Sequence, residues 1–246
     1  MRAAILESPG RVIVQEVPAP TPGPGEVVVE IDLAGVCGSD VALFEGRRPA
    51  AYPLILGHEA VGRIVDPVGT RVVIEPNIPC GTCAVCRRRR GNVCPHKRSL
   101  GLNSPGVFAE RVALPAEFVH PLPPEIGLLD AVGLEPLAVA VHAFGVGQVE
   151  PGDPMAVIGC GTEGLLLIQV AVAMGARVLA ADIRADRLAA AQRLGATDLV
   201  QIPTDDAPDR RSTLHYRWSP MAGRSSSSDW PPQRCPSCRC GSSVVD

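Results

Sequence analysis

One glycine-rich segment constrains the fold of this 246-residue chain more than any other feature. It reads Val157-Ile-Gly159-Cys-Gly161-Thr-Glu-Gly164, between a strand-like apolar run and a helix-like run. Glycines at this spacing permit a tight turn and let a pyrophosphate approach the helix N-terminus. Asp182 ends the next apolar run, where a carboxylate can bind ribose hydroxyls. The pattern predicts a dinucleotide site whose cofactor-binding residues are Gly159, Gly161, Gly164 and Asp182.

The carboxylate of Asp182 also bears on which dinucleotide binds. Its charge would repel a 2′-phosphate, which favours NAD over NADP. The nearby Arg184 keeps this preference moderate, because a guanidinium would attract the same phosphate.

The residues around this turn alternate between helix-like and strand-like patterns. Leu128–Val146 can form a helix that is interrupted at Glu135-Pro136. The later segments predict, in order, a strand at Met155–Gly159, a helix at Glu163–Met174, a strand at Arg177–Asp182, a helix at Ala185–Leu194 and a strand at Asp198–Ile202. Strand–helix–strand–helix–strand is the first half of a doubly wound parallel sheet.

The N-terminal half has a different period. Short β-segments alternate with Pro and Gly at Ala3–Leu6, Arg11–Val17, Val27–Leu33, Ala60–Val65, Arg71–Glu75 and Phe108–Leu114. Many short strands between turn signals predict a barrel or sandwich. After residue 207 no period persists, and the composition predicts disorder. We therefore expect domains at 1–147 and 148–207, followed by an aberrant tail at 208–246.

Four cysteines form the strongest local motif, at positions 80, 83, 86 and 94. Each Cys-x-x-Cys step lets two thiolates face one centre, and four sulfurs complete a closed tetrahedral shell, so Cys80, Cys83, Cys86 and Cys94 predict a structural zinc site. Four arginines, Arg87–Arg90, lie inside this loop. A nucleic-acid module is one interpretation of them, but no aromatic residues interleave, which favours a solvated face.

A second set of metal-binding residue types is dispersed. Cys37 lies in Cys37-Gly-Ser39-Asp40, while His58 and Glu59 are adjacent. One thiolate, one imidazole and one carboxylate suit a catalytic zinc with an open coordination position. By themselves a single Cys and a single His are more often packing residues, and that alternative stays open here.

Charge and composition exclude other classes. The formal net charge is −3, which argues against a general nucleic-acid binder. No apolar run has the length of a membrane span, and the N-terminus lacks a signal-peptide pattern. Cysteines at metal-binding spacing rather than in a disulfide framework are typical of a cytosolic chain. We expect a cytoplasmic protein without a membrane or nucleic-acid partner.

Together, these motifs resemble those of the zinc-dependent medium-chain dehydrogenases of the alcohol dehydrogenase superfamily. The resemblance runs from Met1 to about Ala207 and includes Glu135-Pro-Leu137. It implies a GroES-like catalytic barrel followed by a Rossmann domain, here truncated. It also implies NAD(P)-linked hydride transfer between an alcohol and a carbonyl, with two zinc ions.

The resemblance assigns roles residue by residue. Cys37 and His58 would bind the catalytic zinc, with Glu59 as an exchangeable or direct carboxylate ligand. Glu135 stands where alcohol dehydrogenases proper often have cysteine and polyol, threonine and sugar dehydrogenases tend to have glutamate. It is a further candidate ligand and favours a polyol-like or other polar secondary alcohol.

A proton route is also implied. Ser39 would pass the alcohol proton to solvent, because the relay histidine often found further along is replaced here by Ala42. Asp40 would orient the ring of His58.

One departure from the family is severe. Its Rossmann domain has six strands, whereas this sequence supplies three, and the missing half normally forms the dimer interface. Exposed edges then predict poor stability, and an inactive zinc-binding remnant is the alternative function. The serine run Ser225–Ser228 suggests that the segment from about Arg210 comes from a shifted reading frame, with a native disordered tail as the alternative.

Overall fold

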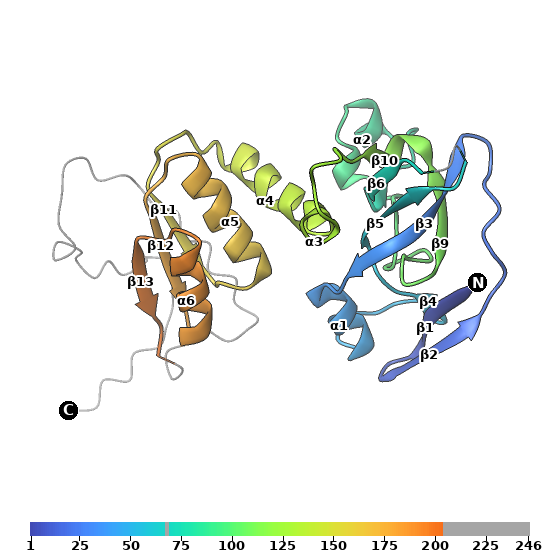
Figure 1. Ribbon diagram of the computed structural model, residues 1–246, viewed down its shortest axis with the longest axis horizontal. Helices are drawn as coiled ribbons and strands as arrows, with labels where there is room; N and C mark the ends of the chain where they lie inside the picture. The colour runs from blue at the N-terminus through green and yellow to red at the C-terminus, as the bar shows by residue number, and fades with distance from the viewer. Residues whose placement is uncertain (67–68, 204–246) are drawn as a thin grey trace. The chain divides into compact units, whose positions relative to one another are not determined.

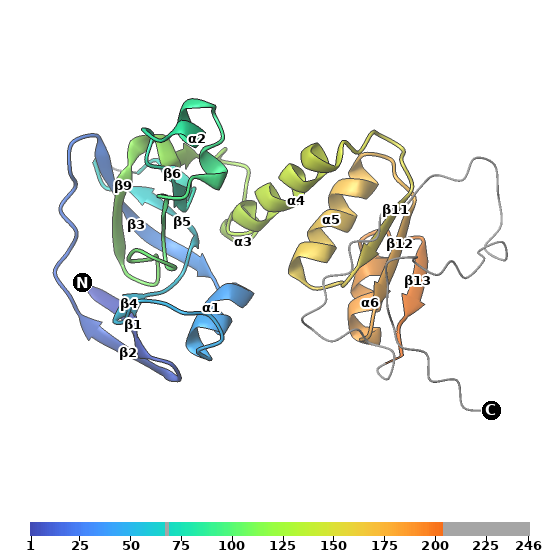
Figure 2. The same cartoon turned by 180° about the vertical axis from the view of Figure 1, so that it is seen from behind.

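The N-terminal half is built from short antiparallel strands. The computed structural model describes residues 1–66 and 69–203 (Figures 1 and 2). Its largest sheet has the order β10-β6-β5-β3-β9. The strands in that order are Val119–Pro121, Arg71–Ile74, Glu59–Ile64, Glu26–Gly35 and Arg111–Pro115. All four pairings are antiparallel, as expected for strands joined by turns.

A three-stranded sheet, with the order β2-β1-β4, accompanies the larger sheet. It consists of Arg11–Glu16, Arg2–Ser8 and Leu54–Ile55. A bridge between Ala3 and Ala109 links it to the chain that enters β9. A two-stranded sheet of β7 (Asn77–Ile78) and β8 (Arg98–Ser99) flanks the cysteine loop.

Alternating burial along the strands forms the core of the barrel. Val29 on β3, and Val72 and Ile74 on β6, are almost completely inaccessible. Burying a side chain of this size contributes about 1.5–3 kcal/mol. A second cluster, around Leu6 and Leu43, packs helix α1 (Gly38–Phe44) against the smaller sheet. That packing fixes the helix that begins next to Cys37.

The second part is a parallel sheet with the order β11-β12-β13. Its strands are Met155–Ile158, Val178–Asp182 and Asp198–Gln201, joined by α5 (Thr162–Ala173) and α6 (Ala185–Arg193). Figures 1 and 2 show the two helices next to each other against this sheet. The apolar period placed all five elements to within one residue at either end.

The helix expected around Glu135-Pro136 is interrupted, but two residues earlier than predicted. Helix α3 (Leu128–Ala131) ends before Gly133, and α4 (Leu134–Gly147) begins directly after it. Pro136 therefore lies in the first turn of α4, where a missing N–H costs no intrahelical hydrogen bond.

Several short elements were not predicted from the sequence. Besides α1, these are strands β4, β7, β8 and β10 and the one-turn helices α2 (Ala84–Arg87), η1 (Gly91–Val93) and η2 (Ala116–Phe118). Such elements are too short to show a hydrophobic period. The predicted fold class, a GroES-like barrel followed by a Rossmann-type sheet, is confirmed.

The domain boundaries stay predictions. Helix α4 ends at Gly147, next to the boundary placed at 147/148, and β11 begins at Met155. The predicted tail at 208–246, with its proposed change of reading frame, lies outside the described residues. Within the part of the chain that is described, no helix has both the length and the apolar character needed to cross a bilayer.

Candidate metal centres and cofactor turn

Three dispersed residues converge at one end of the barrel. Cys37 precedes helix α1, His58 precedes β5, and Glu59 is the first residue of β5. Their Sγ, ring nitrogen and carboxylate oxygen all lie within 4.8 Å of one another. Antiparallel pairing of Gly35 with Glu59 brings the end of β3 to the start of β5. The thiol, imidazole and carboxylate are thus brought together by strand pairing.

Asp40 holds the two chain segments of this cluster. Its Oδ2 accepts a hydrogen bond from the backbone N–H of Cys37 at 2.9 Å. Its Oδ1 accepts one from the N–H of Gly57 at 3.2 Å. The carboxylate is buried, with 2% of the residue exposed, so these bonds are shielded from water. Asp40 therefore fixes the backbone on both sides of the candidate site.

The ring of His58 lies between two polar partners. Its Nδ1 is 3.5 Å from Asp40 Oδ1, and its Nε2 is 3.4 Å from Ser39 Oγ. Burial by itself lowers the pKa of His58, but the charges of Asp40 and Cys37 outweigh burial and raise the pKa to about 9. A metal ion binds imidazole in its neutral form, so zinc binding would release this proton.

The carboxylate of Glu59 occupies space that only glycine leaves open. A Cβ built on Gly35 would lie 2.3 Å from Glu59 Oε2. A larger residue at position 35 would therefore displace the end of the flexible Glu59 side chain from the position that it occupies. Sequence inspection did not identify this residue.

Glu135 lies outside the converging trio. The group within 4.8 Å contains Cys37, His58 and Glu59 and does not include it. Burial raises the pKa of Glu135, the nearby His58 opposes that shift, and the charge of Glu59 reinforces it. Glu135 is thus within electrostatic reach of the cluster rather than part of it.

The donor set fits zinc. Sulfur, nitrogen and oxygen donors are the three types that zinc accepts, and three protein ligands leave a position for substrate. Asp40 Oδ1 faces the buried Nδ1 of His58 at 3.5 Å, and a carboxylate in this position orients the ring of a metal-binding histidine. Both observations are those expected of residues arranged around a metal ion.

The four clustered cysteines also meet. Their Sγ atoms are separated by 3.5 Å (Cys83–Cys86), 3.6 Å (Cys94–Cys80), 3.8 Å (Cys83–Cys94) and 3.9 Å (Cys80–Cys86). A disulfide would require about 2 Å. A tetrahedron of zinc–sulfur bonds has edges of about 3.8 Å, so the four sulfurs match a closed zinc shell.

Hydrogen bonds from backbone N–H groups favour the thiolate form of some of these cysteines, which is the form that binds metal. The N–H of Cys86 donates to Cys83 Sγ, and the N–H of His96 donates to Cys94 Sγ. Backbone hydrogen bonds lower the pKa of Cys80 to about 6 and also lower that of Cys83. Burial raises the pKa of Cys86 to about 12, so a metal ion would have to displace its proton.

The glycine-rich turn has the geometry that its spacing predicted. Gly159 has φ +93°, a conformation that favours glycine. A Cβ on Gly164 would lie 1.9 Å from the carbonyl oxygen of Gly159, so helix α5 could not approach the strand with a larger residue there. Nothing lies within 4 Å of a Cβ on Gly161, which leaves the start of α5 open.

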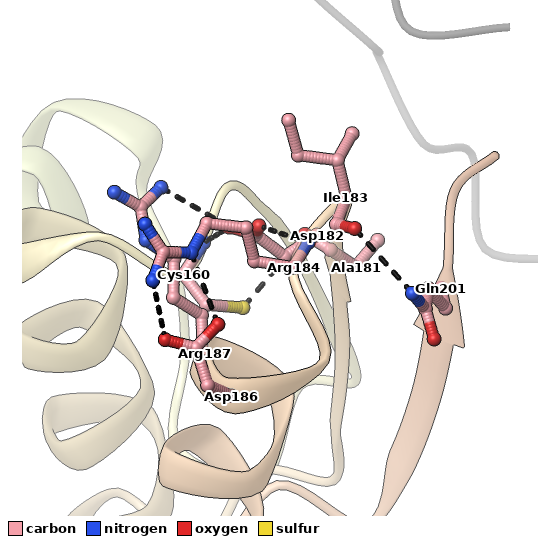
Figure 3. A network of polar contacts seen from close by, with 8 residues as sticks. All are labelled: Cys160, Ala181, Asp182, Ile183, Arg184, Asp186, Arg187 and Gln201. Carbon is pink, nitrogen blue, oxygen red and sulfur yellow. Dashed lines mark hydrogen bonds and ion pairs between the residues drawn. The ribbon is translucent and has the colours of Figure 1, made fainter. Parts of the chain in front are cut away.

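Asp182 lies at the end of β12 and reaches the same turn (Figure 3). Its Oδ2 accepts a hydrogen bond from the N–H of Cys160 at 2.6 Å, and its Oδ1 accepts one from the N–H of Arg184 at 2.8 Å. Arg187 Nη1 lies 3.8 Å from the same Oδ2. Each carboxylate oxygen can accept a further hydrogen bond beyond the one from the backbone.

Sequence inspection missed two charged neighbours of Asp182. Asp186 binds the guanidinium of Arg184 through both oxygens, with Nε–Oδ1 at 3.0 Å and Nη2–Oδ2 at 2.6 Å (Figure 3). Arg187 is the second. Asp186 and Arg187 both lie in the first turn of α6, a few residues after Asp182. Their closeness to Asp182 in the sequence is the signal that could have identified them.

Comparison with known families agrees with this geometry. Residues 23–124 match the alcohol dehydrogenase GroES-like domain, and residues 164–217 match the zinc-binding dehydrogenase family. The second match extends past residue 207, where the resemblance was expected to end.

Two curated relatives illustrate the likeness. An uncharacterized zinc-type alcohol dehydrogenase-like protein of Haemophilus influenzae is 30% identical over 96% of this chain and 78% of its own length. The sorbitol dehydrogenase of Bacillus subtilis is 32% identical over 87% of this chain and 65% of its own length. The chain thus spans less than two thirds of the second protein.

Solved structures give the same result. The short chain alcohol dehydrogenase RspB of Escherichia coli CFT073, in complex with NADH, has a TM-score of 0.79 and 33% identity, covering 85% of this chain and 64% of that one. Galactitol-1-phosphate dehydrogenase of Escherichia coli has a TM-score of 0.77 and 35% identity, covering 82% and 61%. This chain therefore belongs to the zinc-type alcohol dehydrogenase family of medium-chain dehydrogenases.

Proposed function

We propose that this chain contains the catalytic machinery of a zinc- and NAD-linked alcohol dehydrogenase that interconverts a small alcohol and its carbonyl. The convergence of Cys37, His58 and Glu59 within 4.8 Å carries the proposal. These three side chains would hold the catalytic zinc and leave one position open. Cys80, Cys83, Cys86 and Cys94 would hold a second, structural zinc.

When bound, zinc would supply the charge that lowers the pKa of a substrate hydroxyl, and NAD would supply the hydride acceptor. The chain itself positions the reactants and moves the proton. Asp40 fixes the backbone of Cys37 and of Gly57, the residue before His58, through its two hydrogen bonds. Ser39, whose Oγ lies 3.4 Å from His58 Nε2, accepts the proton of the alcohol and passes it to water.

The turn at Gly159, Gly161 and Gly164 would bind the pyrophosphate at the N-terminus of α5. Asp182 would bind the ribose hydroxyls through the lone pairs that Cys160 and Arg184 leave free. Its buried negative charge favours NAD over NADP.

The substrate we propose is a polyol or another polar secondary alcohol. Glu135 interacts electrostatically with His58 and Glu59, and it would place a further carboxylate near the proposed catalytic zinc. We propose Glu59 rather than Glu135 as the third ligand, because Glu135 lies outside the converging group. Relatives include sorbitol dehydrogenases and a protein named as a probable D-xylulose reductase A, which supports the same class.

The test combines zinc content with turnover. We expect two zinc ions per chain by mass spectrometry, and NAD-dependent oxidation of sorbitol or xylitol. Cys37→Ser should remove one zinc and the activity, while Cys83→Ser should remove the other zinc. Cys160→Ser is the matched control and should retain both ions, because this buried thiol belongs to neither cluster.

A different result would favour the alternative function. A chain that retains both zinc ions and binds NAD but oxidises no alcohol would be a zinc-binding remnant without turnover. Zinc content unaffected by Cys37→Ser would contradict the proposed catalytic site.

We place the protein in the cytoplasm, because both candidate zinc sites require reduced thiols. Its proposed partner is a small molecule rather than nucleic acid or a membrane.

A further inference from the structure

The run Arg87–Arg90 has no part in the chemistry proposed above. It lies in a stretch, residues 76–109, that contains no aspartate or glutamate. The same stretch contains six cationic side chains: Arg87, Arg88, Arg89, Arg90, Lys97 and Arg98. For a chain with a formal net charge of −3, this is a strong local excess of positive charge.

Three of these six cations have partners. Arg87 donates to the carbonyl oxygen of Thr82, and Lys97 donates to that of Asn92 at 3.1 Å. Arg98 pairs with Glu26 at 3.2 Å. The side chains of Arg88, Arg89 and Arg90 are exposed and make no hydrogen bond or ion pair within the described residues.

These three arginines do not neutralise the sulfur centre. The hydrogen bonds to Sγ atoms in the described structure come from backbone N–H groups of this loop, from the Thr82 hydroxyl and from the neighbouring thiols. No guanidinium donates to a sulfur there. The arginines therefore are not explained by the charge of the thiolates.

Arg89 also occupies an unusual backbone position. Its φ is +57°, directly after the C-cap of α2, where glycine is the usual residue. The turn is closed by hydrogen bonds from the N–H of Arg89 to the carbonyl of Cys86 at 2.8 Å and from that of Arg90 to the carbonyl of Val85 at 3.1 Å. Arginine thus occupies a position where glycine would close the same turn with less backbone strain.

We propose that Arg88, Arg89 and Arg90 form a docking surface for an acidic segment of another protein. Guanidinium groups bind carboxylates through two parallel hydrogen bonds, and arginine is enriched in protein interfaces. Val93 lies beside this surface, 52% exposed, with its N–H bonded to the carbonyl of Arg90. An acidic segment that carries an apolar residue matches this surface.

The observations favour a protein over other polyanions. Residues 80–97 contain no Phe, Tyr or Trp, so bases would have no ring to stack on. Three available guanidinium groups are fewer than the roughly 6–10 phosphate contacts of a typical DNA-binding protein.

The test uses the full chain with its zinc content verified and a fluorescein-labelled hexaglutamate peptide as probe. We expect saturable binding by fluorescence anisotropy that weakens as salt increases. Arg88→Gln/Arg89→Gln/Arg90→Gln should weaken it by about tenfold. Arg2→Gln/Arg11→Gln/Arg63→Gln changes the net charge equally at paired arginines of the barrel and should leave the affinity within about twofold.

A single variant separates docking from folding. Glycine suits the backbone conformation at position 89 better than arginine does. Arg89→Gly should therefore keep the Cys80–Cys94 loop folded while weakening peptide binding by about twofold to fivefold. Absence of peptide binding to the parent chain would overturn the proposal, as would equal losses in the two triple variants. Tighter arginine-dependent binding of a short DNA duplex or of phosphatidylserine vesicles would replace the proposed partner with another one.

Discussion

The carboxylate of Asp182 binds the backbone N–H of Cys160 at 2.6 Å and thereby fastens the glycine-rich turn to the end of the neighbouring strand. Both residues are buried, with 4% and 0% of their surfaces exposed. The acid expected to bind a ribose therefore also shapes the turn expected to bind the pyrophosphate. One substitution at this position should affect both tasks.

Asp182→Asn tests this double role. An amide has a single acceptor oxygen, so the N–H of either Cys160 or Arg184 would lose its partner, which costs about 1–3 kcal/mol of unfolding free energy. We expect NAD affinity to fall by roughly tenfold or more, because a charge-assisted hydrogen bond is lost as well. Urea unfolding and calorimetric titration with NAD measure the two effects.

The matched control is Asp198→Asn. Asp198 pairs with the exposed Arg177, which directly precedes the adjacent strand β12, and surface pairs of this kind contribute about 0–1 kcal/mol. Equal losses in the two variants would contradict the assigned role of Asp182.

Asp186 should influence the choice between NAD and NADP. It neutralises Arg184, whose guanidinium would otherwise be available to a 2′-phosphate. Because the pair is exposed, Asp186→Asn should raise the affinity for NADP by about twofold to fivefold and leave that for NAD nearly unchanged. Titration with 2′,5′-ADP and 5′-ADP measures this, and a parallel change for both nucleotides would refute it.

Gly35→Ala should disturb the candidate catalytic metal site alone. The new Cβ would meet Glu59 Oε2 at 2.3 Å and push that carboxylate away from Cys37 and His58. We expect loss of one zinc, while the four-cysteine site remains loaded. Gly145→Ala is the control: it has open space in α4 and should raise stability by up to about 1 kcal/mol. Retention of two tightly bound zinc ions by Gly35→Ala would count against Glu59 as a ligand.

Arg89→Gly should stabilise the Cys80–Cys94 loop. A left-handed conformation costs a non-glycine residue about 1–2 kcal/mol, although greater freedom of glycine in the unfolded chain offsets part of the gain. The neighbouring Arg88 has φ −89°, so Arg88→Gly should lower stability instead. Thermal unfolding at fixed zinc concentration distinguishes the two, and a lower melting temperature for Arg89→Gly would be the contrary result.

Local patterns were sufficient where neighbours along the chain determine the structure. The strand–turn–helix at Gly159–Gly164 follows from the steric freedom of glycine and the apolar period on both sides. The Cys80–Cys94 loop folds on itself, so spacing alone predicted that its sulfurs would meet. For the same reason, the elements from β11 to β13 were placed almost residue by residue.

The tertiary structure decided which distant residues meet and what surrounds them. Cys37 and His58 were ambiguous in the sequence, because isolated residues of these types usually pack in a core. Pairing of β3 with β5 and the two hydrogen bonds of Asp40 brought them together, and the same packing left Glu135 outside the group. Sequence spacing specifies contacts within a turn or a helix, whereas contacts between strands depend on register and burial, which only the folded chain establishes.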